Sequence, residues 1–158
     1  MAFFEAITNK LQVLAGITPK ELLKQLFEDK EFTDLIIRLN TEGEQTSQLI
    51  YGVNSKDESL SDIGGEYSPY TVAIKKDKGQ IIDWVTLKDT GFFYRSFQTY
   101  WDENASGIRI TADTIKEGGV DLISRWGEDI IGLDEQNIGV LRDYARTKLK
   151  DIVLKIAA

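Results

Sequence analysis

The chain of 158 residues contains no cysteine and no histidine. Disulfides are therefore impossible, and so are metal sites built from thiolate or imidazole ligands. Ser-His-Asp and Cys-His catalysis are excluded for the same reason. Any general acid or base would have to be Asp, Glu, Lys or Tyr, and any metal site would have only oxygen ligands, which suit Ca²⁺ or Mg²⁺.

Long apolar runs and positive charge are also scarce. No apolar stretch approaches 18 residues, so we expect no membrane-spanning helix and no membrane partner. The formal net charge is −7, and the longest basic cluster is "KKDK" at 75–78. Binding to DNA irrespective of sequence requires a basic face that displaces counterions from phosphates. The composition therefore disfavours specific nucleic-acid binding, although DNA could pass an acidic surface without sticking to it.

The first 20 residues do not have the pattern of a signal peptide. They lack a basic leader, and Glu5, Lys10 and Gln12 interrupt the apolar stretch. We expect a short amphipathic helix there instead. A clearer helix begins at Thr18-Pro19, because Thr18 is a typical N-cap and the missing N–H of proline costs nothing at the first helical position.

Apolar residues then recur at helical spacing from 19 to about 41, which predicts one long helix or two in near succession. Glu21 is placed to complete a capping box with Thr18. Gly43 is expected to break the helix, and a short helical turn near Gln48 should stop at Gly52. Residues 1–52 are thus predicted to be a helical region.

Residues 53–71 are rich in Asn, Ser, Asp, Gly and Pro, which predicts a loop. The following segment, 72–113, is predicted to form the sheet. "YTVAIKK" at 70–76 is β-branched enough for a short strand, "QIIDWVTLKDTG" at 80–91 is a second extended candidate, and a hairpin is expected over roughly 93–113. A helical first turn after Gly91 stays open.

The last region, 120–158, is predicted to be helical. A helical turn or two should end at Gly127, and a long amphipathic helix should follow Asp134 as N-cap, with Leu133 and Ile138 at the staple positions. We therefore expect a single domain over 1–158 of the α+β class, with a small, mainly antiparallel sheet packed against N-terminal helices and a long C-terminal helix.

Four carboxylates lie in the predicted loop, at Asp57, Glu58, Asp62 and Glu66. Their spacing does not fit the calcium-binding loop D-x-[DN]-x-[DN]-G-x5-E, so a solvated acidic loop is the favoured interpretation. A carboxylate-dependent hydrolase would require two acids held apart in a cleft, and nothing in the sequence singles out such a pair. No metal, cofactor or catalytic residue is predicted.

Six aromatic residues fall within residues 92–101, directly after Thr90-Gly91. A base-stacking platform would interleave rings with cations, but only Lys88 and Arg95 are available here. Two interpretations of the aromatic run stay open: all its rings pack in the core, or some pack in the core while others contact a partner. The interface candidates in and around this run are Tyr67, Tyr70, Trp84, Phe92, Tyr94 and Tyr100.

The segment "LKDTGFFYRSF" resembles the L-x-x-T-G-x-L-x-x-S signature of phage virion-morphogenesis or tail-completion proteins. The matching residues are Leu87, Thr90, Gly91 and Ser96, with Phe93 at the apolar position. The order of segments over 35–158 is also similar to that of small structural proteins from virion gene blocks of tailed bacteriophages, including crAss-like and Bacteroides phages. The segments are, in order, "LIIRLNTE", "YSPYT", "KKDKGQ", the Thr-Gly segment, a hairpin, "LISRWG" and a C-terminal helix.

The resemblance implies a non-enzymatic virion protein, made in the cytoplasm of the host bacterium and placed at the head–tail junction or in the tail. It implies a homo-oligomeric ring that contacts other virion proteins such as portal, connector or tail proteins, without a cofactor. The alternatives are a small intracellular adaptor or immunity-type binding protein and, less favoured, the carboxylate-dependent hydrolase.

Overall fold

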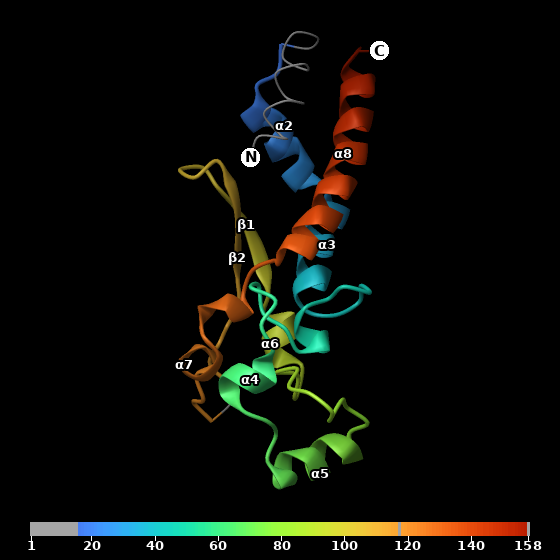
Figure 1. Ribbon diagram of the computed structural model, residues 1–158. Coiled ribbons are helices and arrows are strands. Elements are labelled where there is room, and N and C mark those ends of the chain that lie inside the picture. Colours follow the sequence, from blue (N-terminus) through green and yellow to red (C-terminus); the bar gives the residue numbers. More distant parts are fainter. Residues whose placement is uncertain (1–15, 117, 158) are drawn as a thin grey trace.

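The computed structural model describes residues 16–116 and 118–157, and it is elongated (Figure 1). Helices α2 and α8 and the two-stranded hairpin lie towards one end, and helix α5 lies at the other. The short amphipathic helix was expected in the first 20 residues, of which residues 1–15 lie outside the described part of the chain. The α+β fold class is confirmed.

The N-terminal helical segment consists of two helices, α2 (Pro19–Glu28) and α3 (Lys30–Asn40). The predicted capping box is present, since the Glu21 N–H donates to Thr18 Oγ1 at 3.3 Å and the Thr18 N–H donates to Glu21 Oε2 at 2.7 Å. Asp29 separates the helices because its extended backbone stops α2 while its carboxylate accepts the Phe32 N–H at 3.1 Å. The alternative of two successive helices is thus the correct one.

The C-terminal helix α8 (Glu135–Ala157) begins directly after Asp134, as predicted. The Asp134 carboxylate accepts the Asn137 N–H at 2.7 Å, which satisfies one of the free donors of the first turn. This helix packs against α2 and α3 around one apolar cluster. Its buried members are Leu22, Leu26, Phe32, Ile36, Ala145 and Leu149.

The sheet is a single antiparallel hairpin of β1 (Gln98–Asp102) and β2 (Gly107–Thr111). The register runs from Gln98 opposite Thr111 to Asp102 opposite Gly107. The predicted hairpin is therefore confirmed, but the sheet occupies much less of 72–113 than expected. Ile110 packs against both apolar clusters of the molecule and so ties the hairpin to the two ends.

The strand predicted at 70–76 is wrong, because this segment forms helix α5 (Pro69–Asp77). Ser68 is the N-cap, and its hydroxyl accepts the Thr71 N–H at 3.2 Å. Pro69 occupies the first helical position, where its fixed backbone favours a helix. The local capping signal therefore outweighs the β-branched composition of the segment.

The extended segment predicted at 80–91 makes no β-ladder. Side chains take the place of a partner strand, since the Val85 N–H donates to Ser61 Oγ at 3.1 Å and the Thr86 N–H donates to the Tyr67 hydroxyl at 2.9 Å. Val85 and Thr86 are both buried, so these donors need partners inside the protein. The apolar pattern reflects burial between other elements and not membership of a sheet.

The Thr-Gly step leads into one helical turn, α6 (Phe92–Arg95), and the strand begins only at Gln98. Gly91 has a φ of 80°, a left-handed conformation that glycine adopts without steric cost. The open alternative of a helical first turn is thus confirmed.

A second apolar cluster fills the other half of the molecule, between η1 (Leu49–Tyr51), α4 (Leu60–Gly64), α6, α7 (Leu122–Trp126) and η2 (Glu128–Ile130). Helix α4 lies inside the predicted loop, whereas the short turn ending at Gly52 and the helix ending at Gly127 agree with prediction. The buried members are Leu49, Leu60, Val85, Leu87, Phe93, Tyr94, Phe97, Leu122, Trp126 and Ile130.

Phe93, Phe97 and Trp101 do not pack together. Phe93 and Phe97 pack edge to face, with centroids 5.1 Å apart, inside this second cluster. Trp101 instead lies 6.2 Å from the ring of Phe27, beside the first cluster. The helical turn of α6 causes this difference, because it rotates the side chains before the strand begins.

A buried polar network joins the two halves. Gln48 is its centre: the side-chain oxygen accepts the Asp134 N–H at 2.9 Å, and the side-chain amide donates to the Gly132 carbonyl at 2.9 Å. Asn137 donates to the same Gln48 oxygen at 3.1 Å and to the Thr46 carbonyl at 2.8 Å. These bonds fix the start of α8 against the loop that follows α3.

Candidate interaction surface

The structure does not gather the six aromatic interface candidates into one patch. Tyr70 is the most exposed, at 77%, and Trp84, Phe92 and Tyr100 are also exposed. Tyr67 is half-buried against the second apolar cluster. The candidates therefore lie on the hairpin, at the Thr-Gly corner and around α5, and each has to be judged in its own surroundings.

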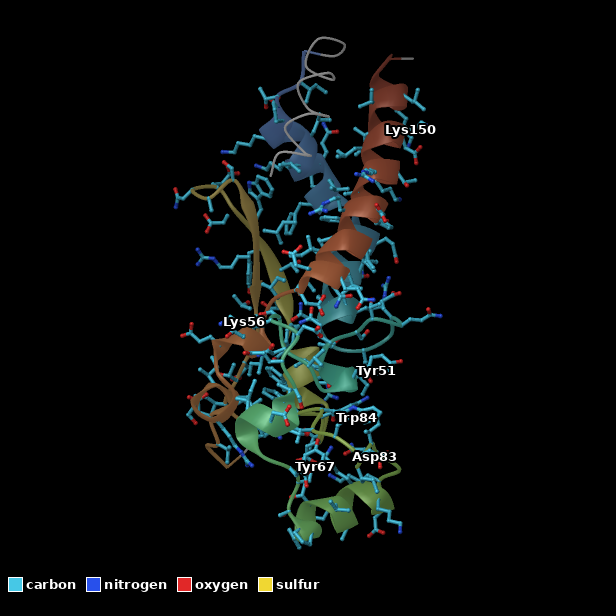
Figure 2. All side chains as sticks on the ribbon, viewed as in Figure 1. Tyr51, Lys56, Tyr67, Asp83, Trp84 and Lys150 are labelled. Carbon is cyan, nitrogen blue, oxygen red and sulfur yellow. The ribbon has the colours of Figure 1, made fainter. Side chains whose placement is uncertain are left out.

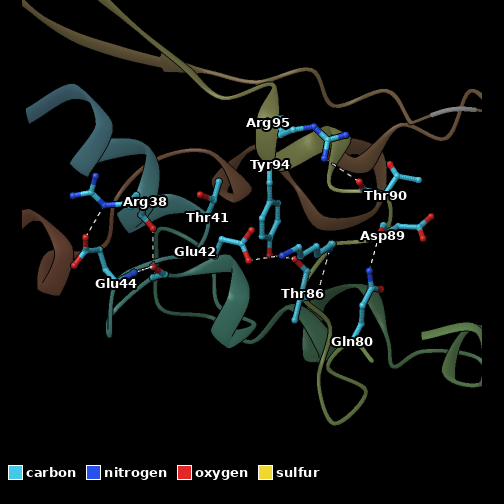
Figure 3. Close-up of polar contacts among 12 residues, drawn as sticks. Arg38, Thr41, Glu42, Glu44, Gln80, Thr86, Asp89, Thr90, Tyr94 and Arg95 are labelled. Carbon is cyan, nitrogen blue, oxygen red and sulfur yellow. Dashed lines mark hydrogen bonds and ion pairs between the residues drawn. The ribbon is translucent and has the colours of Figure 1, made fainter. Parts of the chain in front are cut away.

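Tyr94 is not an interface residue of the folded chain, because it is only 5% exposed. Its hydroxyl donates to the Thr86 carbonyl (Figure 3), and its ring packs in the second cluster. Burial raises the pKa of the Tyr94 phenol well above its ordinary value. It lies in the helical turn α6, which points its side chain into the protein.

Trp84 lies over the turn that carries Tyr51, a residue that the sequence analysis missed and that is 53% exposed (Figure 2). The Trp84 Nε1–H donates to the Ile50 carbonyl at 2.9 Å. Gly52 lies so close that a Cβ there would stand 2.7 Å from Trp84 Cδ1, so glycine allows the indole to lie over this turn. Sequence signals for Tyr51 were limited to its position at the end of a short helical turn.

Phe92 and Tyr100 are separated along the chain. Phe92 lies at the start of α6 and lines a depression that also includes Thr90 and Lys116. Tyr100 lies on β1 opposite Arg109. These two rings cannot act through the same flat strand face, although each remains available at the surface.

Helix α5 is attached mainly through polar groups and stands apart from the rest of the chain (Figure 1). Lys75 is its one buried residue. The Lys75 ammonium donates to the Lys88 carbonyl and to Gln80 Oε1, the latter at 3.1 Å. Lys78 pairs with Asp89 at 2.7 Å. The Gln80 amide donates to the Asp89 carbonyl at 2.7 Å (Figure 3).

A pocket of about 310 Å³ lies between α5, residues 87–89 and α7. Its lining includes four lysines, namely Lys75, Lys78, Lys88 and Lys116. The sequence analysis noted the "KKDK" cluster, which contributes two of them, and named Lys88 only as a single cation beside the aromatic run. The other two come from segments 10 or more residues further along the chain, so only the fold brings the four charges together.

The acidic loop does not form a cation site in the described part of the chain. Asp62 belongs to α4, and Glu58 accepts the Asn54 side-chain amide at 2.9 Å. Among residues 16–116 and 118–157, no group of three or more Asp or Glu side chains is arranged to hold a metal ion. Within the same residues, no helix is both long enough and apolar enough to cross a membrane.

No protein-family model, curated protein or solved structure matches this chain. The described surface has three features of note: helix α5 with its polar anchors and the exposed Tyr70, the exposed rings of Tyr51 and Trp84 at one turn, and the lysine-lined pocket.

Proposed function

We propose that this chain is a structural subunit of a tailed-bacteriophage particle, at the head–tail junction or in the tail, and that it assembles as a homo-oligomeric ring. The observation that supports this most directly is α5, a helix that buries one lysine and leaves Tyr70 almost fully exposed.

A helix this short gains little stability by itself, because most helical stability in proteins comes from packing an apolar face. In the isolated chain α5 has polar anchors, while Val72 and Ile74 are only partly covered. A neighbouring copy that covers Tyr70 and these residues would provide the missing packing. A ring requires head-to-tail contacts, in which two different surfaces meet. The exposed rings of Tyr51 and Trp84 provide aromatic surface away from Tyr70.

The motif residues that resemble the tail-completion signature each have a structural role, which is compatible with the proposal. Leu87 and Phe93 are buried, and Gly91 adopts a left-handed conformation. Ser96 closes the corner, since its hydroxyl accepts the Asp113 N–H at 2.9 Å and donates to the Phe93 carbonyl at 2.7 Å. This corner positions α5 and the hairpin on either side of the 87–91 segment.

The test measures the mass of the full chain by light scattering after size exclusion, over a range of concentrations, and searches purified virions for the protein by mass spectrometry. We expect a concentration-dependent homo-oligomer that Tyr70→Ser weakens. The matched variant Tyr100→Ser, on the hairpin, reports whether the contact lies at α5. A monomer at high concentration that is also missing from virions contradicts the proposal, and a one-to-one heterocomplex would support an adaptor instead.

A further inference from the structure

The lysine pocket holds more positive charge than the protein neutralises. Lys78 is paired with Asp89 at 2.7 Å, and Lys88 is paired with Glu42. Within the described residues, no carboxylate lies at ion-pair distance from Lys75 or from Lys116, the other two lysines of the pocket. Among the residues that the structure describes, two of the four ammonium groups therefore have no direct ion pair.

Lys75 is the more deeply placed of these two, at 4% exposed. Within the described residues, its ammonium contacts neutral groups, namely the Lys88 carbonyl, Gln80 Oε1 and the ring of Tyr67, whose centroid is 4.8 Å away. Asp89, which is paired with Lys78, attracts it from beyond ion-pair distance. Burying a cation among neutral groups is costly unless an opposite charge compensates it. The position of Lys75 is more readily explained if an anion occupies the pocket beside it.

Lys116 lies where three adjoining depressions meet, since it lines each of them. Desolvation lowers the pKa of its ammonium, and the charges of Lys75 and Lys78 lower it further, whereas Asp89 and Tyr67 act in the opposite direction. Its backbone is held in a turn by the hydrogen bond from the Lys116 N–H to the Val120 carbonyl at 2.9 Å. The side chain can therefore be changed without removing this turn.

We propose that this pocket binds a phosphate dianion, either inorganic phosphate or a phosphate monoester. Lys116 contacts the anion directly, and the buried Lys75 attracts the anion through its charge. A phosphate group carries a charge of about −1.5 to −2 at neutral pH and offers strong acceptor oxygens, which matches two uncompensated ammonium groups. The Tyr67 and Thr71 side chains also line the pocket, with the Tyr67 hydroxyl bonded to Thr86 and the Thr71 hydroxyl bonded to Ser68. This proposal does not depend on the oligomeric function.

The experiment titrates the purified full chain with inorganic phosphate by calorimetry, at constant ionic strength set with sodium chloride, and repeats the titration with acetate as a monovalent comparison. We expect saturable binding of one phosphate per chain and at least tenfold weaker binding of acetate. Lys116→Gln should weaken phosphate binding at least tenfold. Lys150→Gln removes an exposed charge on α8, far from the pocket (Figure 2), and should leave binding unchanged.

Lys75→Met is a second variant, and we expect it to weaken phosphate binding while circular dichroism verifies that it folds. A titration with glycerol phosphate identifies the source: tighter binding than inorganic phosphate favours an ester, and weaker binding favours the free ion. Equal affinity for phosphate and acetate overturns the proposal, as does equal binding by the Lys116 and Lys150 variants. The proposal is also overturned if the protein binds no phosphate and Lys116→Gln abolishes a homo-oligomer. That result would indicate that a carboxylate from a second copy of the chain occupies the pocket.

Discussion

Gly64 and Trp126 lie so close together that a Cβ on Gly64 would stand 2.1 Å from the indole Nε1. This contact is where α4 packs on α7, and the same indole N–H donates to the Leu60 carbonyl at 3.2 Å. The backbone of Gly64 is not in the left-handed region, so a lack of space, and not a backbone requirement, explains the glycine.

We therefore expect Gly64→Ala to destabilise the protein by about 2–4 kcal/mol, because the buried indole would have to move and give up its hydrogen bond. Gly139→Ala is the matched control: it lies inside α8 with no atom within 4 Å of the added Cβ, so alanine should stabilise by about 0.5–1 kcal/mol. Urea unfolding measures both changes. Equal effects at the two positions would contradict the packing that we describe.

Removing the Tyr94 hydroxyl should also be costly. Tyr94→Phe leaves the Thr86 carbonyl in a buried place without this donor, so we expect a loss of about 1–3 kcal/mol in the free energy of unfolding. Tyr100→Phe removes the same atom from an exposed ring and should change stability by less than about 0.5 kcal/mol. Thermal or urea unfolding of the two variants compares them, and a neutral Tyr94→Phe would show that the bond adds no stability.

The local signals that predicted structure correctly were those decided within a few residues. Two of these signals begin a helix by accepting hydrogen bonds from free N–H groups of its first turn: Thr18, together with Glu21, and Asp134. The third, Gly52, ends the short helical turn η1. Ser68-Pro69 carries the same start signal as Thr18-Pro19, and the helix that it begins was missed because β-branched residues follow. Capping geometry was the more reliable guide in both places.

The rest depends on contacts between distant segments. Residues 85–86 have the composition of a strand, yet their N–H groups are satisfied by Ser61 and Tyr67, which no local pattern reveals. The lysine pocket is likewise formed by α5, residues 87–89 and Lys116, so its charge was hidden in a sequence with a net negative charge. Contacts between distant segments also decide that the Tyr70 ring is exposed and the Tyr94 ring is buried.

Glu103 should titrate at unusually low pH. Hydrogen bonds from Lys20 and then Lys24 lower the pKa of Glu103 from its ordinary 4.5 to about 2. Because the pKa is lower in the folded state, the stabilisation is present above about pH 4.5 and is lost as the pH falls towards 2. Carboxyl-carbon NMR titration measures this pKa directly. At about 1 M salt, where screening extends over roughly 3 Å, the pKa should rise towards 4.5.

The hydrogen bonds of Gln48 predict a large effect from a substitution that preserves shape. Gln48→Met removes the partners of the Asp134 N–H, the Gly132 carbonyl and the Asn137 amide in a buried place, so we expect a loss of about 3 kcal/mol. Gln136→Met makes the same change at an exposed position of α8 and should alter stability by less than about 0.5 kcal/mol. Urea unfolding compares the variants, and hydrogen exchange should show faster exchange of the Asp134 amide in Gln48→Met alone. Unchanged exchange would mean that Gln48 does not fix the start of α8, and the two halves of the molecule would then be held together chiefly by apolar contacts around Ile110.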